Sequence, residues 1–230
     1  MKTLRFIAVL ACIGLLLGCA KGEGEGKTNP VEAVFKDPLT SKQIKKALIK
    51  LEDMPSGYSE DPDLISDEED EDKITAGSKK CKELDSALNA EDMTENPFGE
   101  GEVGFKQSDF GPFVGEFVSS FKGSRIKDGM GNIRDAFEGC KKFETTDKDG
   151  AKLKFTVAPM SFPKLGDDTI AIKMSGTESS FGMSFDFNII AVRVDQNVVL
   201  MINFGIGKAL GGQKFEKLTR LAVERIDQAA

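Results

Sequence analysis

The chain has 230 residues, with 31 Lys and Arg against 38 Asp and Glu, a net charge of −7 and no His. This length allows one sizeable domain or two small ones. A hydrophobic fraction of 40% excludes wholesale disorder, and the acidic balance argues against a nucleic-acid binder. Without imidazole there is no Ser-His-Asp or Cys-His nucleophile and no His-ligated zinc or haem, which leaves carboxylate, Lys or Ser-Lys chemistry open to an enzyme.

The N-terminus has the pattern of an export signal. Lys2 and Arg5 precede an uncharged run over residues 6–17, which is too short to span a bilayer and is typical of the apolar part of a signal peptide. The run ends in Leu-Leu-Gly-Cys at residues 16–19, which resembles the lipobox of bacterial lipoproteins. That resemblance implies cleavage after residue 18 and acylation of Cys19, palmitate included. The alternative is an ordinary signal peptide or anchor with a chance Cys.

The rest of the chain divides into a tether and a body. Residues 19–38 include the stretch KGEGEGKTNP, which has no apolar residue to bury, so we expect a flexible tether. Residues 39–230 form the expected domain. Its two cysteines, Cys81 and Cys140, would be exported to an oxidising compartment in which a disulfide persists. Two free buried thiols are the alternative.

Four segments have the apolar spacing of amphipathic helices. In the first, Thr40 or Ser41 is a candidate N-cap, and Ile44, Leu48 and Leu51 form one stripe up to the turn at Pro55. The other three segments also have one apolar face each, and two of these faces carry the cysteines. A disulfide between two helices is therefore plausible. The four predicted helices cover residues 41–54, 78–89, 124–141 and 212–228.

Six segments have the alternation or the solid apolar runs of strands. One of them, residues 113–121, places Phe113 and Phe117 on one face and Val114 and Val118 on the other. The others centre on residues 103–105, 153–157, 170–174, 181–189 and 198–202. The order of the elements and the short links predict an α+β fold, a mostly antiparallel sheet of about six strands with helices packed on one face.

An ordered set of features resembles a known family. The set comprises ALIKLEDMPSGY at residues 47–58, a Cys on the next helix, a Phe-rich strand pair, a helix ending in the second Cys, and VRVDQNVVLMINF at residues 192–204 before a last helix. It is similar to actinobacterial lipoproteins whose body resembles the PknH-like extracellular sensor domain family. The resemblance implies an extracytoplasmic α+β domain, braced by the pair Cys81 and Cys140, with a cleft for a ligand.

Candidate ligand contacts lie on the late strands. Large apolar side chains there could line a lipophilic cavity, although the same residues at period two would also form an ordinary core; they are Phe181, Met183, Phe185, Phe187 and Met201. Arg193 lies between two valines and could reach a carboxylate or phosphate of a ligand, or could simply be a strand charge facing an edge.

Three further segments look like ion or phosphate sites and are interpreted otherwise. The acidic run Glu60–Asp72 lacks the order of a calcium loop and is expected to be a solvated loop, with cation contact as the alternative. Residues 147–150 are expected to form a hairpin turn. Residues 99–105, rich in Gly, lack the Lys-Ser/Thr of a P-loop and are not expected to bind phosphate. We therefore predict no metal and no cofactor.

These observations favour a membrane-anchored extracytoplasmic lipoprotein with a non-enzymatic, sensor-like or ligand-binding domain. Its expected partners are the cell membrane, through Cys19, and an unknown small molecule, lipid or envelope protein, with no nucleic acid. The alternative is a structural or protein-interaction lipoprotein of the cell envelope that has no ligand cavity.

Overall fold

The structure is a computed structural model that describes residues 36–64, 73–82, 97–123, 125–146, 151–179 and 182–230. The expected signal peptide, Cys19 and Phe181 lie outside these residues. The helices are α1 (Ser41–Ala47), α3 (Arg125–Gly139) and α4 (Gly212–Ala229), with 3-10 turns η2 (Leu51–Asp53) and η3 (Pro62–Leu64). The strands are β1 (Ser59–Glu60), β2 (Lys73–Gly77), β3 (Gly99–Lys106), β4 (Phe113–Ser120), β5 (Lys142–Thr146), β6 (Lys152–Pro159), β7 (Asp168–Glu178), β8 (Ser184–Val194) and β9 (Asn197–Ile206).

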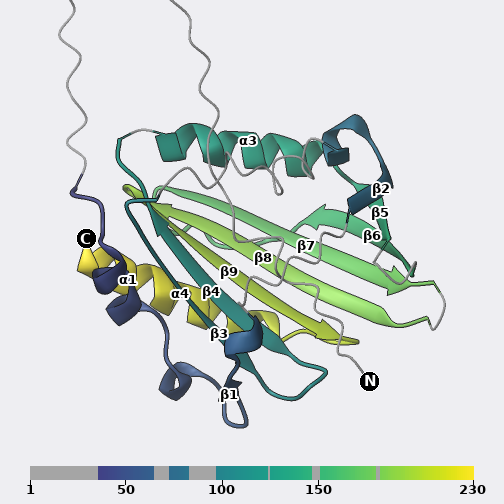
Figure 1. Cartoon of the computed structure of the whole chain (residues 1–230), viewed down its shortest axis with the longest axis horizontal. Helices are drawn as coiled ribbons and strands as arrows, with labels where there is room; N and C mark the ends of the chain where they lie inside the picture. Colours follow the sequence, from purple (N-terminus) through teal and green to yellow (C-terminus); the bar gives the residue numbers. More distant parts are fainter. Residues whose placement is uncertain (1–35, 65–72, 83–96, 124, 147–150, 180–181) are drawn as a thin grey trace, which may run out of the picture.

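The strands form one sheet in the order β1-β3-β4-β9-β8-β7-β6-β5-β2 (Figure 1). Every neighbouring pair is antiparallel, which confirms the expected type of sheet. The expected number of about six strands is wrong, because the described residues form a sheet of nine. The additional strands are β1, β2 and β5, which have two, five and five residues and are too short for an alternating pattern to be recognised.

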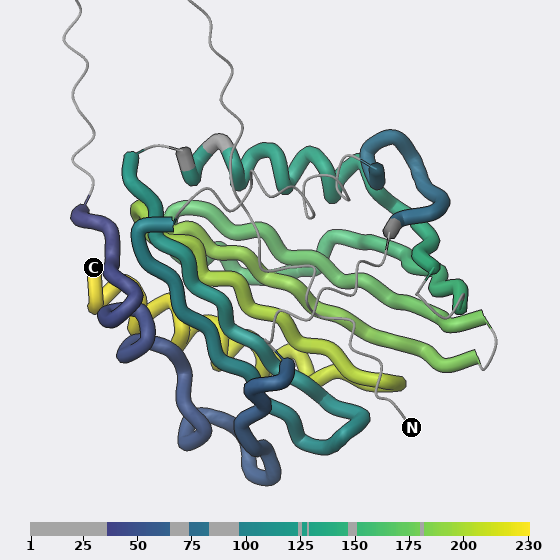
Figure 2. Tube along the Cα trace, viewed as in Figure 1, coloured from purple at the N-terminus to yellow at the C-terminus, as the bar shows by residue number. Residues whose placement is uncertain are grey.

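Helices cover both faces of the sheet, so the expectation of helices on one face is wrong. Along β9, Val198, Leu200, Ile202 and Phe204 belong to a core with α3, whereas Val199 and Met201 belong to a second core with α1 and α4. Because successive side chains of a strand point to opposite faces, the two cores lie on opposite sides of the sheet. In Figure 2 the tube of α4 passes behind the strands and α3 lies clear of it.

The first helix is shorter than its apolar spacing predicts. Thr40 caps α1 and makes a reciprocal capping box with Gln43, as expected of an N-cap. The helix ends at Ala47, and Leu48 has left the helical conformation (φ −54°, ψ 153°). Leu48 remains buried, but Leu51 is 42% exposed and does not continue the stripe.

The remaining helices agree with the sequence as far as they are described. The expected helices over 124–141 and 212–228 are α3 and α4, displaced by one or two residues at their ends. Residues 79–82 are helical, and the rest of the expected helix over 78–89 lies outside the described residues. In β4, Phe117 packs on the α3 side and Val114 and Val118 pack on the other, as predicted.

The described chain begins in contact with the body. The backbone N–H of Lys36 donates to Asp195 Oδ2 at 2.8 Å, and the Gln196 side chain donates to the carbonyl oxygen of Lys36. A Cβ at Gly99 would lie 2.2 Å from the carbonyl oxygen of Leu39, so a glycine is needed for this segment to cross β3. Lys36, assigned above to the tether, therefore already lies against the β8–β9 turn.

Candidate functional site

A cleft of about 750 Å³ lies beside α3, where β6 ends and β7 begins. Its wall is formed by α3, by the end of β6, by the connecting residues 160–167 and by the first half of β7. The residues that line it are Arg134, Phe137, Glu138, Lys141, Val157, Ala158, Pro159, Met160, Phe162, Lys164, Asp168, Thr169, Ile170, Ala171 and Ile172.

The end of β6 creates the cleft. The last β6–β7 pair is Pro159 with Ile172, and one further bond joins the N–H of Met160 to the carbonyl oxygen of Ala171 at 2.9 Å. Proline has no N–H to donate to the ladder and is found at strand ends. Residues 168–170 of β7 therefore lack β6 beside them, and they line the cleft.

The floor is apolar and belongs to the core on the α3 side. Val157, Ile170 and Ile172 are each less than 8% exposed and pack in the same cluster as Phe137 of α3. On α3, Phe137 follows the apolar spacing of Ile133 and Met130, which turns it towards the sheet. Buried apolar groups thus form the inner side of the cleft.

The connecting residues 160–167 are held to the sheet. The N–H of Leu165 donates to Thr169 Oγ1 at 2.9 Å, and that hydroxyl donates to the carbonyl oxygen of Leu165 at 2.6 Å. The N–H of Asp167 donates to the carbonyl oxygen of Arg193 at 2.9 Å. Gly166 has φ +54°, and a Cβ there would lie 2.3 Å from that same oxygen. This wall of the cleft is consequently tied to both β7 and β8.

An ion pair crosses the cleft. Arg134 Nη2 of α3 lies 2.5 Å from Asp168 Oδ1 of β7, and both side chains are about one third exposed. Burial alone would raise the pKa of Asp168, but the hydrogen bond and charge of Arg134 and the N–H of Thr169 lower it below its ordinary value. The hydrogen bond to Asp168 raises the pKa of Arg134 against the effect of desolvation. Both groups are therefore held in their charged forms.

Two lysines line the cleft and form no ion pair with another described residue. Among the described residues, no carboxylate lies within ion-pair distance of Lys141 or Lys164. Both are exposed. Glu138 also lines the cleft, four residues after Arg134 on α3, and its charge acts on Arg134.

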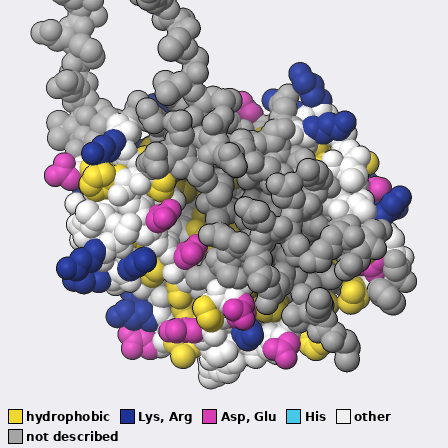
Figure 3. Space-filling view, viewed as in Figure 1, with side chains coloured by type: hydrophobic (Ala, Val, Ile, Leu, Met, Phe, Trp, Pro, Cys, Tyr) yellow, Lys and Arg dark blue, Asp and Glu magenta, His cyan; other side chains and the backbone are white. Residues whose placement is uncertain are grey.

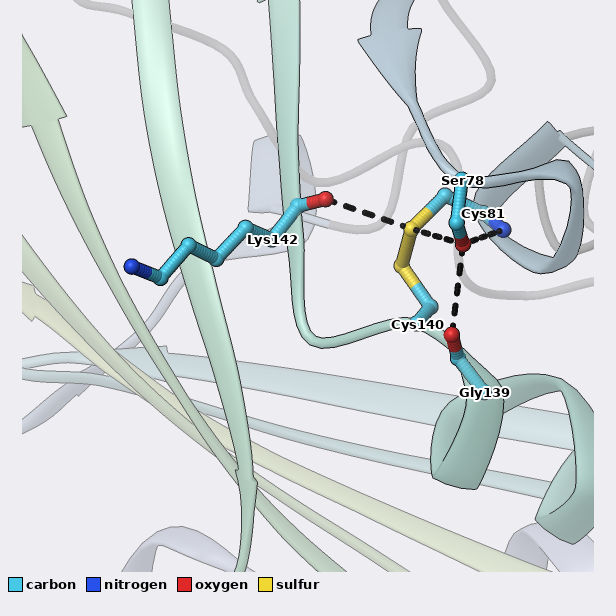
Figure 4. The surroundings of a disulfide bond; sticks show 5 residues. All are labelled: Ser78, Cys81, Gly139, Cys140 and Lys142. Carbon is cyan, nitrogen blue, oxygen red and sulfur yellow. Dashed lines mark hydrogen bonds between the residues drawn. A yellow bond between two sulfur atoms is a disulfide. The ribbon is translucent and has the colours of Figure 1, made fainter.

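The predicted disulfide fixes the end of α3. Cys81 and Cys140 are bridged, with their Cα atoms 4.7 Å apart. In Figure 4, Ser78 Oγ donates to the carbonyl oxygen of Gly139 at 3.2 Å and accepts from the N–H of Cys81 at 3.2 Å. Next to the bridge, the carbonyl oxygen of Lys141 accepts from the N–H of Val157 at 2.8 Å. The backbone that carries Lys141 is therefore held by α3, the bridge and β6.

The predicted late-strand ligand contacts do not line this cleft. Phe185 and Phe187 are buried on the α3 side. Phe187 stacks on Phe204 at 5.4 Å and contacts Phe155 edge-on at 6.0 Å, as members of a packed core do. Met183 is partly buried against the same core, Met201 lies in the core of the opposite face, and Phe181 lies outside the described residues. The sheet thus separates Met201 from Met183, Phe185 and Phe187.

Arg193 is engaged by the protein itself. It lies on β8, an inner strand, and its side chain is 17% exposed. Its Nη1 lies 3.1 Å from Asp167 Oδ2 and donates to the carbonyl oxygen of Asp195 at 3.3 Å. Asp167 also accepts from the N–H of Asp195 at 2.7 Å. Arg193 therefore links Asp167 and Asp195 at one end of the β7–β8 pair, and it is not among the residues that line the cleft.

The other segments singled out in the sequence have structural roles where they are described. Within the acidic run, Asp61 is buried with its carboxylate 3.6 Å from Lys106 Nζ, and residues 65–72 lie outside the described residues. Residues 147–150 also lie outside them, between strands β5 and β6 that pair antiparallel. The Gly-rich residues 99–105 form most of β3. No cluster of described side chains has the composition of a metal site, and no described helix could span a membrane.

A buried carboxylic acid was not anticipated from the sequence. Glu116 of β4 is 0% exposed, and its Oε2 accepts from the N–H of Ile49 at 2.7 Å. Its Oε1 has no partner among the described residues. Burial raises the pKa of Glu116 to about 7. The available signal was its position between Val114 and Val118, which face the core.

Comparisons with known proteins relate this chain to others by fold. No family model matches the sequence, and no curated protein matches it. Among solved structures, it is similar to the extracellular domain of PknH from Mycobacterium tuberculosis, with a TM-score of 0.58 and 12% identity. The match covers 84% of this chain and 98% of that one. The chain therefore has the fold of that extracellular domain, as the sequence resemblance implied.

Proposed function

We propose that this chain is an extracytoplasmic, non-enzymatic binding domain whose ligand occupies the cleft between α3 and the β6–β7 end of the sheet. The observation that carries the proposal is the cleft itself. Its volume of about 750 Å³ falls within the range of about 300–1,000 Å³ that is usual for small-molecule sites, and it combines an apolar floor with a few charged groups.

The charged groups of the cleft support binding over catalysis. A general acid or base works best with a pKa near the working pH. The ion pair of Arg134 and Asp168 moves both pKa values away from neutral pH, because it lowers the pKa of Asp168 and raises that of Arg134. Neither is poised to exchange a proton near neutrality.

The similarity in fold to an extracellular domain supports a position outside the cytoplasm. The same proposal includes removal of residues 1–18 and acylation of Cys19, which rests on the sequence of residues 2–19 alone. At about 0.8 kcal/mol for each buried CH₂, two or three acyl chains would hold the domain at the membrane. Mass spectrometry of the mature protein should find acylated Cys19, and an unmodified product that starts elsewhere would refute this part.

The alternative role, a docking surface with no cavity, has less support. The large apolar side chains that are most exposed among the described residues, Leu51, Phe98 and Phe110, come from three separate segments. On the part of the face in Figure 3 that is not covered by grey atoms, charged side chains of both signs are interspersed. A protein-docking face normally presents a contiguous apolar patch.

The binding proposal can be tested without knowing the ligand. Ala158 is exposed and lines the cleft from the face of β6 opposite to Val157, so Ala158→Trp would obstruct the cleft at its rim. Ala76, an exposed alanine of β2 outside the cleft, gives the matched control Ala76→Trp. Each protein is mixed with a small-molecule and lipid extract of the producing cells and examined by native mass spectrometry. A bound mass on the wild type and on Ala76→Trp, lost in Ala158→Trp, is expected. An empty wild type, or equal binding to all three, would refute the proposal.

A further inference from the structure

We infer that the ligand of this cleft is an amphiphile with one anionic head group and an apolar body, a carboxylate or phosphate head on an acyl chain. The inference rests on the proposed function and adds the chemical class of the ligand. It follows from which charges in the cleft are already neutralised and from where the apolar surface lies.

The charges of the cleft leave an excess of cations. Arg134 is paired with Asp168 at 2.5 Å, and Glu138 acts on the same guanidinium from the next turn of α3. Lys141 and Lys164 remain with no carboxylate in reach among the described residues. An anionic group of the ligand would give these two ammonium groups charge-assisted hydrogen bonds, which are stronger than neutral ones.

Both lysines extend from backbone that is already fixed. Lys141 follows the disulfide-bonded Cys140, and its carbonyl oxygen is bonded to the N–H of Val157. Lys164 precedes Leu165, whose N–H and carbonyl oxygen both bond to the Thr169 hydroxyl. A ligand head group would therefore have to order only the lysine side chains, because the two backbone segments are held without it.

Half-buried apolar side chains select the rest of the ligand. Val157, Ile170 and Ile172 are already buried, so the apolar surface that the cleft still presents comes from Met160 and Phe162, which are half-buried and pack against the core on the α4 side. Covering these two side chains with an acyl chain is favourable by roughly 25 cal/mol for each Å² removed from water. A small inorganic anion would leave them uncovered, and a neutral apolar molecule would form no ion pair with the two lysines.

The test uses oleate below its micelle concentration and the mature full-length protein, with binding measured by calorimetry. Oleyl alcohol keeps the chain without the charge, and butyrate keeps the carboxylate without the long chain. Oleoyl lysophosphatidic acid presents a phosphate head and distinguishes the two head groups. We expect oleate, the phosphate, or both to bind in a ratio of one to one, and at least about tenfold more tightly than the alcohol and butyrate. Equal binding of oleate and oleyl alcohol would overturn the inference.

Charge substitutions locate the head group. Lys141→Gln with Lys164→Gln should weaken binding of the preferred amphiphile at least about tenfold. Lys214→Gln with Lys217→Gln makes the same change in charge at exposed positions of α4, on the other side of the sheet, and should leave binding unchanged. Equal losses in both double variants would contradict the assignment.

If cell extract gives a mass that Ala158→Trp abolishes but neither amphiphile binds, the class of ligand is wrong and the binding function stands. If the extract gives no such mass and neither amphiphile binds, the ligand class and the binding function are both wrong.

Discussion

Arg225 of α4 donates two hydrogen bonds to the carboxylate of Asp53, from Nη1 to Oδ2 at 2.6 Å and from Nη2 to Oδ1 at 2.9 Å. The pair joins residues that are 172 positions apart in the sequence. Arg225 Nη1 also donates to the carbonyl oxygen of Leu48 at 3.1 Å. Burial alone would raise the pKa of Asp53, but the bonds from Arg225 and from the Lys50 N–H lower it. This contact fixes the segment after α1 against the last helix.

Removing the contact between Arg225 and Asp53 should lower the free energy of unfolding. Arg225→Met keeps the aliphatic stem and leaves the Asp53 side chain, 12% exposed, without its cation. Since breaking a partly buried pair leaves an uncompensated charge, we expect a loss of about 2 kcal/mol in the free energy of unfolding, measured with urea. Arg220→Met removes an exposed i,i+4 pair with Glu216 from the same helix and should cost less than about 0.5 kcal/mol. Equal effects would refute the special role of Arg225.

Glu116 should make stability depend on pH. Its pKa is raised to about 7 in the folded protein from 4.5, so between these values the folded state binds more protons than the unfolded state. Its contribution to stability is therefore complete below pH 4.5 and falls as the pH rises towards 7. Glu116→Gln removes this titration.

The measurement is the difference in unfolding free energy between wild type and Glu116→Gln from pH 4 to pH 8. Relative to the variant, the wild type should lose up to about 3 kcal/mol over that range. A difference between wild type and Glu116→Gln that stays constant with pH would show that Glu116 titrates normally.

The disulfide should stabilise the fold and the cleft together. Cys81 and Cys140 are 59 positions apart, and closing a loop of that length contributes about 4 kcal/mol by chain entropy. Cys81→Ser with Cys140→Ser should lower the urea midpoint accordingly. In conditions in which this variant is still folded, amide exchange should rise at residues 139–143 more than in α4. A rise that is uniform over the whole chain would argue against a local role beside the cleft.

Asp168→Asn should separate stability from binding. The pair with Arg134 is about one third exposed on both sides, so its loss should cost less than about 1 kcal/mol. Releasing Arg134 adds a free cation to the cleft, and oleate should then bind more tightly. The exposed ion pair of Lys173 and Asp186 offers the control Asp186→Asn, which should leave binding unchanged. Weaker oleate binding in Asp168→Asn would contradict the proposed position of the head group.

The sequence predicted the long elements because their patterns are long. Strands β4, β6, β7, β8 and β9 and helices α3 and α4 have at least eight residues each, with a clear period or a solid apolar run. In β2 and β5 the only large apolar residues are Ile74 and Phe143, so no period exists to be found. The sequence did contain a signal for helices on the second face of the sheet, which the prediction of helices on one face did not use. Ile189–Val192 is a solid apolar run, which is typical of strands covered on both faces.

The cleft could not be predicted in this way. Phe137, Pro159, Lys164 and Ile170 come from four segments, each with an unremarkable local pattern, and they meet only in the folded sheet. The late-strand Phe residues have a stronger pattern because they form the core. Apolar periodicity finds what is buried, whereas a ligand site depends on where the packing stops.

The measurement that tests the central claim most directly is amide hydrogen exchange of the mature protein with and without the extract of the producing cells. A ligand in the cleft should slow exchange in residues 134–141 and 157–172 and leave α4 unchanged, and Ala158→Trp should abolish the effect. No protection anywhere, or protection confined to α1 and α4, would contradict the account.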